Sequence, residues 1–276
     1  MKSQKRSGCC LTIAGSDSGG NAGVQADLRA FHAYGLHGCT VFAALTAQNP
    51  FGVSAIHAIP ADFVGAQLDA VLGIYDIRAL KTGMLAEPDV IETVAERLGR
   101  HREIARVVDP VMIATSGAKL ISDAAIETLK KQLLPLATLI TPNIPEAEVL
   151  CGRSMSALKL AKELHGSFGC AVLVKGGHGE GPDSVDTLYD GKDFLEFKMP
   201  RVENPVSTHG TGCSLAAALA AELALGHDLV ASVAGAKRYV HEAIRNSYFV
   251  GKDCGVLGFA GLFGGGRRPS PDLTVV

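Results

Sequence analysis

The chain has 276 residues, of which 47% are hydrophobic and 20% are charged, and its formal net charge is -2. This composition suits a globular protein with a substantial core, and it argues against a nucleic-acid binder that works by neutralising phosphates. The apolar stretch behind the basic N-terminus is only about six residues, too short for a signal peptide or a membrane span. We therefore expect a cytoplasmic protein with neither nucleic acid nor a membrane as a partner.

Cysteine spacing excludes two further classes of protein. The number of cysteines is odd, no C-x-x-C motif occurs, and the spacing is irregular, so neither a disulfide framework nor a zinc cluster is indicated. We expect most of them to be reduced, buried side chains. The seven are Cys9, Cys10, Cys39, Cys151, Cys170, Cys213 and Cys254.

Short apolar or β-branched runs alternate with helical patterns along the first half of the chain. In chain order the patterns predict a strand at 9–15, a helix at 22–35 that Gly35 closes, strands at 39–48 and 52–60, an amphipathic helix at 61–73, a strand with its exit loop at 77–85, and a helix at 87–101.

The second half continues this alternation and adds a hairpin. The patterns predict a strand at 105–112, a helix at 122–135, a strand at 137–143, helices at 145–152 and 155–169, a strand at 170–177, a hairpin at 184–200, and helices at 211–225 and 228–248. The hairpin is expected to turn at Asp190-Gly191, a favoured two-residue turn.

Strands that alternate with helices of this length predict an α/β fold with a mostly parallel central sheet and helices on both faces. No linker rich in proline, serine or charge interrupts residues 10–250. We therefore expect a single domain at 9–262, between a flexible N-terminus at 1–8 and a flexible, Gly- and Pro-rich tail at 263–276.

Ligands of open α/β sheets bind beyond the carboxyl ends of the strands. Here the expected strand exits are polar and rich in glycine, and although each could be an ordinary turn, together they predict a ligand site at one edge of the sheet. They lie at 14–23, 46–49, 81–84, 108–112, 141–148, 174–179 and 208–213.

The turn Gly210-Thr211-Gly212 precedes an alanine-rich helix. Glycine allows close backbone approach, and the first N–H groups of a helix attract anions, so this turn is a candidate anion hole for a phosphoryl group. The chain has neither a Walker motif nor a proper G-x-G-x-x-G fingerprint, which argues against a P-loop NTPase and a Rossmann dehydrogenase.

Asp109 follows a buried strand, and Glu146 lies in the first turn of a short helix, three residues after Asn143. Oxygen ligands of this kind suit Mg²⁺, while Lys175 at another strand exit could neutralise a nucleotide phosphate. The alternative is structural: Asp109 forms a turn, Glu146 stabilises a helix start, and Lys175 extends into solvent at a strand end.

Cys213 lies at the expected N-terminus of the last-but-one helix, a position that lowers the pKa of a thiol. It could take a proton from a substrate hydroxyl, act as a nucleophile, or simply pack in the core. His209 is near in sequence, but a spacing of four residues across a turn does not establish contact between the two side chains.

Taken together, the motifs resemble the hydroxymethylpyrimidine/phosphomethylpyrimidine kinase family, the thiamin-biosynthesis branch of the ribokinase-like superfamily. The resemblance covers roughly residues 9–250. It rests on the ordered set LTIAGSDSGGNAGVQADL, ALTAQN, KTGML, VVDPVM, LLPLATLITPNIPEAEVL, VLVKGGH and THGTGCSLAAALA.

The resemblance implies a pyrimidine pocket. Gln48 would pair with the aminopyrimidine because its amide both donates and accepts, and Met84 would form an adaptable apolar wall. The implied substrate-binding residues are Gly15, Ala22, Asp27, Thr46, Gln48, Met84 and Val111.

The resemblance also implies a catalytic and nucleotide half. Gly210, Thr211 and Gly212 would form the anion hole, with Cys213 as the base or the group that contacts the hydroxymethyl. Lys175, Gly177 and Asn143 would bind the nucleotide, and Asp109 and Glu146 would lie near Mg²⁺. ATP would phosphorylate 4-amino-5-hydroxymethyl-2-methylpyrimidine and then its monophosphate. Some relatives use a monovalent cation, and a homodimer is implied.

One residue departs from the family pattern: Asn21 stands where many relatives have glycine or a small residue. Because Asn tolerates left-handed φ, we expect the loop to keep its shape. Three alternatives remain: a pyridoxal kinase of the same family, a non-catalytic binding protein that kept the fold, and a cysteine-dependent hydrolase, which would need a histidine held against Cys213.

Overall fold

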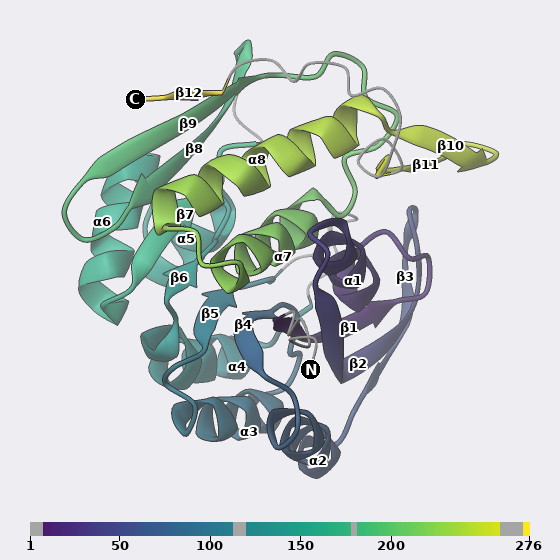
Figure 1. Cartoon of the computed structure of the whole chain (residues 1–276), viewed down its shortest axis with the longest axis vertical. Helices are drawn as coiled ribbons and strands as arrows, with labels where there is room; N and C mark the ends of the chain where they lie inside the picture. The colour runs from purple at the N-terminus through teal and green to yellow at the C-terminus, as the bar shows by residue number, and fades with distance from the viewer. Residues whose placement is uncertain (1–7, 113–119, 178–180, 260–272) are drawn as a thin grey trace, which may run out of the picture.

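The computed structural model describes residues 8–112, 120–177, 181–259 and 273–276. Within these residues ten strands form one sheet in the order β12-β9-β8-β7-β6-β5-β4-β1-β2-β3 (Figure 1). The strands are β1 (Cys9–Asp17), β2 (His37–Asn49), β3 (Gly52–Ala58), β4 (Ile77–Thr82), β5 (Ala105–Val108), β6 (Leu139–Ile140), β7 (Ala171–Val174), β8 (Asp183–Tyr189), β9 (Phe194–Pro200) and β12 (Thr274–Val275).

The centre of the sheet is parallel and its two sides are antiparallel. From β7 through β6, β5, β4 and β1 to β2, each neighbouring pair runs parallel. Strand β3 pairs antiparallel with β2 at one side, and β8, β9 and β12 are antiparallel additions at the other. The prediction of a mostly parallel α/β sheet is therefore confirmed.

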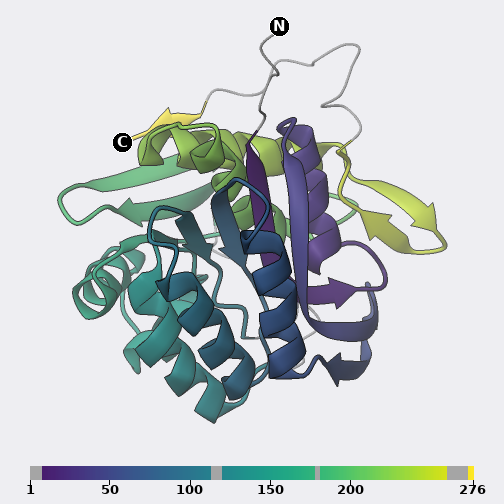
Figure 2. The ribbon, with the colours of Figure 1, turned by 60° about the horizontal axis from the view of Figure 1, so that its bottom comes forward.

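Helices cover both faces of the sheet (Figure 2). One face carries α2 to α6, and the other carries α1, α7 and α8. The helices are α1 (Gly23–Ala33), α2 (Ala61–Leu72), α3 (Pro88–Gly99), α4 (Asp123–Thr128), α5 (Ile144–Cys151), α6 (Ala157–Phe168), α7 (Thr211–Ala224) and α8 (Leu229–Arg245).

The core is divided in two because strand side chains alternate between the faces. In β1, Leu11 and Ile13 pack toward α2–α6, whereas Cys10 packs toward α1, α7 and α8. In β5, Val108 and Val107 divide in the same way. Both faces of these strands are therefore apolar, as the uninterrupted apolar runs in the sequence indicated.

Three local predictions need correction. The helix expected at 122–135 is α4 followed by a π-helical turn at Leu129–Leu133 and a 3₁₀ turn at Leu134–Leu136, because Pro135 cannot continue an α-helix. The last helix ends at Arg245, and the residues after it form an antiparallel hairpin of β10 (Tyr248–Gly251) and β11 (Cys254–Val256).

The β8–β9 connection has four residues, not the two-residue turn expected at Asp190-Gly191, since Tyr189 pairs with Phe194. The Asp190 carboxylate accepts hydrogen bonds from the backbone N–H groups of Lys192 and Asp193, both at 2.8 Å. These side-chain bonds stabilise the wider loop.

The end of the chain also differs from the sequence prediction. Thr274–Val275 pairs with β9, so the tail expected to be flexible at 263–276 ends in a strand of the sheet. The expected flexible N-terminus lies outside the described residues except for Gly8, and so do tail residues 263–272. None of the described helices combines the length and apolarity that a membrane span needs.

The difference in burial between two leucines of the sheet leads to a prediction about the free energy of unfolding. Leu11 in β1 is fully buried, whereas Leu45 in β2 is 44% exposed. Leu11→Ala should lower the free energy of unfolding by about 2–5 kcal/mol, whereas the matched substitution Leu45→Ala should change it by about 0.5 kcal/mol. Urea unfolding measures both, and equal losses would contradict the assigned register of the two strands.

Candidate active site

A cavity of about 470 Å³ opens at the carboxyl ends of the parallel strands. Most of the side chains predicted from the strand exits meet in it, although they come from elements far apart in the sequence. The predicted residues that line it are Gly15, Ala22, Thr46, Gln48, Met84, Asp109, Val111, Asn143, Glu146, Lys175, Gly177, Gly210, Thr211, Gly212 and Cys213.

Asp27 is the exception among the predicted residues. Its carboxylate is fully buried between α1 and β4, where it forms hydrogen-bonded ion pairs with the Lys81 ammonium at 2.9 and 3.1 Å. The Thr12 hydroxyl donates to the same carboxylate at 2.6 Å. Asp27 does not line the cavity, whereas Lys81 does. Asp27 therefore lies behind Lys81, and its contact with the substrate stays a prediction.

The first glycine loop is organised around one buried carboxylate. Asp17 accepts hydrogen bonds from the backbone N–H groups of Gly19 at 2.8 Å, Asn21 at 2.9 Å and Ala22 at 2.8 Å. Burial raises the pKa of Asp17, but the bonds from His209 and the loop N–H groups more than offset this, so its pKa is lowered overall. The loop is therefore fixed by a carboxylate that stays ionised.

The turn before α7 lies directly against this loop. Gly210 has φ +88°, and a β-carbon added there would lie 1.8 Å from the carbonyl oxygen of Asn21. Only glycine fits, for reasons of both conformation and space. The N–H groups of the first helical turn, including those of Gly212 and Cys213, have no acceptor within the helix and lie beside the cavity. Free N–H groups beside a cavity are what an anion hole needs, and the anion hole at this turn stays a prediction.

Asn21 does not take the left-handed conformation that we expected it to tolerate. The positive φ angles of the loop belong to Gly20 at +76° and Gly23 at +57°, and Asn21 is buried with its carbonyl against Gly210. The departure from the family pattern is thus accommodated without backbone strain at residue 21.

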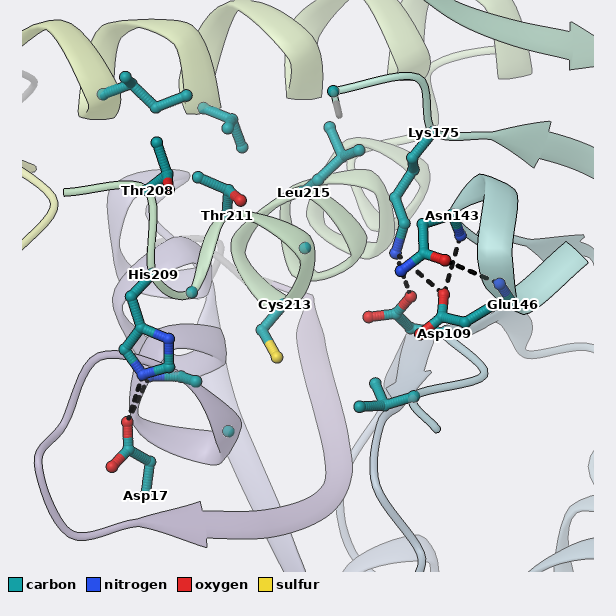
Figure 3. A pocket seen from close by; sticks show the side chains of 18 of the residues that line it. Asp17, Asp109, Asn143, Glu146, Lys175, Thr208, His209, Thr211, Cys213 and Leu215 are labelled. Carbon is teal, nitrogen blue, oxygen red and sulfur yellow. Dashed lines mark hydrogen bonds and ion pairs between the residues drawn. The ribbon is translucent and has the colours of Figure 1, made fainter. Parts of the chain in front are cut away.

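Figure 3 shows Cys213 between two groups of charged side chains. His209 Nε2 lies 3.6 Å from an Asp17 oxygen on one side, and Lys175, Asp109 and Glu146 lie on the other. The ion-pair partner of His209 is thus Asp17, which tethers the residue before Gly210 to the first glycine loop. This arrangement gives no support to the hydrolase alternative, which needs a histidine engaged by the sulfur.

The expected low pKa of Cys213 is not found. Removal of the thiol from water raises its pKa; the Lys81 ammonium and a hydrogen bond from the Gly23 N–H oppose this, while the Asp27 and Asp109 carboxylates add to it. The sequence shows only that Cys213 lies at a helix N-terminus, which lowers the pKa of a thiol. Burial raises this pKa and has the larger effect. In this state the side chain is a thiol at neutral pH.

Lys175 joins the two carboxylates predicted to lie near a metal. Its Nζ donates to Asp109 at 2.6 Å and lies 3.9 Å from a Glu146 oxygen. Burial lowers the pKa of Lys175, but the two carboxylates more than compensate, so its pKa is raised. The Thr141 hydroxyl also donates to Asp109 at 3.0 Å. The three charges therefore form one cluster, in which the two carboxylates are buried and Lys175 is partly exposed.

Asn143 and Glu146 form a reciprocal capping box at the start of α5. Asn143 Oδ1 accepts from the Glu146 N–H, and Glu146 Oε2 accepts from the Asn143 N–H, both at 2.8 Å. The structural interpretation of Glu146 is thus correct, yet the same side chain lines the cavity. Burial raises the pKa of Glu146, and Lys175 opposes this. In the described residues no three His, Cys, Asp or Glu side chains form a metal-binding group.

Sequence reasoning also missed Lys237, a cation beside the loop that follows β7. Lys237 of α8 donates to Asp186 of β8 at 2.7 Å, and the other oxygen of Asp186 accepts from the Gly176 N–H at 2.9 Å. Both side chains line the cavity. The partners lie 51 residues apart, so spacing carried no signal; a charged residue within the alternating pattern of β8 was the only available hint.

Comparisons with known proteins show what the chain is similar to. The family model described as phosphomethylpyrimidine kinase matches residues 17–258. The chain is 48% identical over 252 residues to the thiamine biosynthesis bifunctional protein ThiED of Geobacter sulfurreducens, covering 90% of this chain and 51% of that one. It is 50% identical over 216 residues to the hydroxymethylpyrimidine/phosphomethylpyrimidine kinase of Salmonella typhimurium, covering 76% and 81% of the two chains.

A solved structure, an ADP complex of Bacillus subtilis pyridoxal kinase, superposes with a TM-score of 0.85 at 33% identity, covering 92% of this chain and 98% of that one. The ribokinase-like fold is thereby confirmed.

The contact between the two loops leads to a prediction about Gly210, for which Gly226 after the end of α7 is the control. Gly226 has φ +87°, like Gly210, but a β-carbon there would meet nothing within 4 Å. Gly226→Ala should lower the free energy of unfolding by about 1–2 kcal/mol, and Gly210→Ala should cost a further ~1–3 kcal/mol because of the clash. Chemical denaturation compares the two, and equal losses would contradict the contact with Asn21.

Proposed function

The chain belongs to the phosphomethylpyrimidine kinase family, and on this premise we propose that it transfers the γ-phosphoryl group of ATP to the hydroxymethyl group of 4-amino-5-hydroxymethyl-2-methylpyrimidine and then to the resulting monophosphate. The observation that carries the proposal is the convergence of a glycine anion hole, a cysteine and a lysine–carboxylate cluster in one cavity. This chemistry belongs to thiamin biosynthesis in the relatives named for it.

The acceptor would lie on the side of the first glycine loop. Gln48 lines this part of the cavity, and its side-chain oxygen is 3.1 Å from the Thr46 hydroxyl, which itself donates to the Ser16 carbonyl at 2.7 Å. An amide held in this way can pair with a ring nitrogen and an exocyclic amine. Met84 packs over Gly15, where a β-carbon would lie 2.5 Å from its terminal methyl, and forms an apolar wall for the ring.

Transfer itself would depend on positioning and charge neutralisation. The N–H groups at the start of α7 would bind the phosphoryl oxygens, and the helix dipole would favour the negative charge. Cys213 lines the same cavity and, in its thiolate form, would take the proton of the attacking hydroxyl. Phosphoryl transfer needs little covalent chemistry from the protein. Groups that position the reactants and neutralise charge, such as these, are therefore the types of group that the reaction needs.

The donor side would be the cluster around Lys175. Its ammonium would exchange part of its contact with Asp109 for the phosphates of ATP, near Gly177 and Asn143 at the adjoining strand exits. Asp109 and Glu146 present two hard oxygen ligands within 3.9 Å of one point, the Lys175 nitrogen. Such a pair fits Mg²⁺, which commonly binds one or two carboxylates together with substrate phosphates. When bound, the ion would neutralise charge on the transferred group.

A second candidate is phosphorylation of pyridoxal, and the likeness to the Bacillus subtilis pyridoxal kinase favours it. The identity to that protein is 33%, against 50% to the Salmonella typhimurium enzyme, so the pyrimidine is the preferred substrate in our proposal. The homodimer implied by resemblance remains a prediction, and so does a requirement for a monovalent cation.

The decisive experiment measures ADP release from ATP and Mg²⁺ by the purified protein, with hydroxymethylpyrimidine, its monophosphate and pyridoxal as acceptors. Turnover with the first two is expected. Cys213→Ala should reduce kcat by about 100-fold or more, as loss of a general base does, whereas Cys254→Ala in β11 should leave it unchanged. Preference for pyridoxal, or no turnover with any acceptor, would overturn the proposal.

A second prediction concerns the donor side. Lys175→Met should lower kcat by about 100-fold or more because a charge that neutralises the transferred phosphoryl is lost. The exposed Lys192 in the β8–β9 loop provides the matched control, and Lys192→Met should behave as the unmodified protein does. Steady-state kinetics at saturating acceptor distinguishes the two. An unchanged kcat in Lys175→Met would remove this residue from the catalytic assignment.

A further inference from the structure

The Lys237–Asp186 pair places two buried charges in the wall of the cavity. Lys237 of α8 and Asp186 of β8 are each 5% exposed, and the Lys237 Nζ lies 2.7 Å from an Asp186 oxygen. Removing two charges from water is unfavourable, and a buried pair is often no more stabilising than apolar side chains of the same size. Stability alone therefore does not explain the pair, and both of its side chains line the ligand cavity.

Asp186 also holds the turn that follows β7. Its Oδ2 accepts from the Lys237 ammonium, and its Oδ1 accepts from the Gly176 N–H at 2.9 Å. One carboxylate therefore joins α8 and β8 to the strand exit that carries Lys175 and Gly177. A change of charge at Lys237 acts on this strand exit through Asp186.

Two further contacts give the turn a defined position. A β-carbon at Gly176 would lie 1.9 Å from the Val185 carbonyl oxygen, so only glycine can approach β8 this closely. The Lys175 N–H donates to the Pro142 carbonyl at 2.9 Å. Together with the bond from Gly176 to Asp186, these contacts hold the backbone on both sides of the Lys175 α-carbon, and with it the direction in which the Lys175 side chain leaves β7.

A carboxylate in this place opposes the binding of an anion. The proposed function puts the phosphates of ATP near Lys175 and Gly177, and Asp186 lines the same cavity. Like charges repel each other more strongly in a partly buried site than in water, because the effective dielectric constant is lower. The ammonium of Lys237 neutralises Asp186 and so removes this repulsion.

We propose that Lys237 is a positioning residue for the nucleotide side of the cavity. Asp186 holds the Gly176 turn, and with it Lys175, beside the phosphates, while Lys237 neutralises the carboxylate that does so. This inference rests on the proposed function, because the turn has this role only if a nucleotide binds beside it. Lys237 acts through Asp186 rather than by contact with the phosphates, and the two possibilities give different results when both charges are removed.

The test measures the dissociation constant of ADP in the presence of Mg²⁺, by titration calorimetry on the purified protein without an acceptor. Lys237→Met leaves Asp186 unpaired. Lys237→Met/Asp186→Asn removes both charges but keeps a side-chain oxygen for the Gly176 N–H. Lys237→Met/Asp186→Leu has the same charge as this double variant and a similar shape, but it offers no acceptor. The double variants contain no unpaired buried charge and remain informative if Lys237→Met fails to fold.

Lys237→Met should raise the dissociation constant about 10-fold or more, because an unpaired carboxylate then faces the phosphates. Lys237→Met/Asp186→Asn should return it to within about threefold of the unmodified value. Lys237→Met/Asp186→Leu should keep it raised about 10-fold, because the Gly176 N–H loses its acceptor. If the Asn variant fails to restore binding, Lys237 contacts the nucleotide itself; if the Leu variant restores it as well, the bond to Gly176 has no role. Either result would overturn the proposal.

A second lysine–carboxylate pair provides the matched control. Lys198 pairs with Glu196 on β9 at 2.8 Å, but both side chains are partly exposed, and neither is among the described residues that line the cavity. Lys198→Met should leave the dissociation constant unchanged. Thermal unfolding of all variants identifies a merely structural role, which would lower the melting temperature without changing the affinity of the folded protein, and that outcome would also contradict the proposal.

Binding of ADP needs no acceptor, so the result is separate from the kinase assay. The expected order of dissociation constants without turnover on any acceptor would refute the proposed function, whereas turnover with equal dissociation constants in all variants would refute the role of Lys237. Failure of the unmodified protein to bind ADP would overturn both. In an active enzyme, the Michaelis constant for ATP should follow the dissociation constant of ADP, while that for the pyrimidine should not change.

Discussion

The approach of the α7 turn to the first glycine loop is the contact on which the site depends. A β-carbon at residue 210 would lie 1.8 Å from the Asn21 carbonyl, so the two segments can touch only at a glycine. The contact brings the start of α7 onto the loop that follows β1, and His209 tethers it further through Asp17. The turn before α7 and the loop that follows β1 are therefore held against each other by two contacts.

Charge in the cavity is arranged in pairs. Lys81 with Asp27, Lys175 with Asp109, Lys237 with Asp186 and His209 with Asp17 each join two different segments of the chain. A lone buried cation would lose its charge or destabilise the fold, whereas a paired one remains charged and can exchange part of its contact for a phosphate. The pairs thus allow lysines and carboxylates to be buried beside the cavity.

Burial explains where the sequence was misleading. A cysteine at a helix N-terminus is expected to ionise easily, but the tertiary structure removes Cys213 from water and raises the pKa of its thiol. Asp27 lies in the glycine-rich motif, and the tertiary structure shows that α1 places it in the core against Lys81. In both cases the sequence showed the residue type and its place on a helix, whereas burial and the neighbouring charges came from the tertiary structure.

Periodicity and glycine spacing by themselves were enough for the α/β fold, its mostly parallel sheet and the strand exits that form the cavity, because parallel strands end at one edge wherever β-α-β units repeat. Ordered motifs also identified the family. The tertiary structure alone decided which charges meet, since Lys237 and Asp186 lie 51 residues apart and Lys81 and Asp27 lie 54 apart. Pairing of this kind depends on distances between different strands and helices, and these distances cannot be inferred from the spacing of residues within one strand or helix.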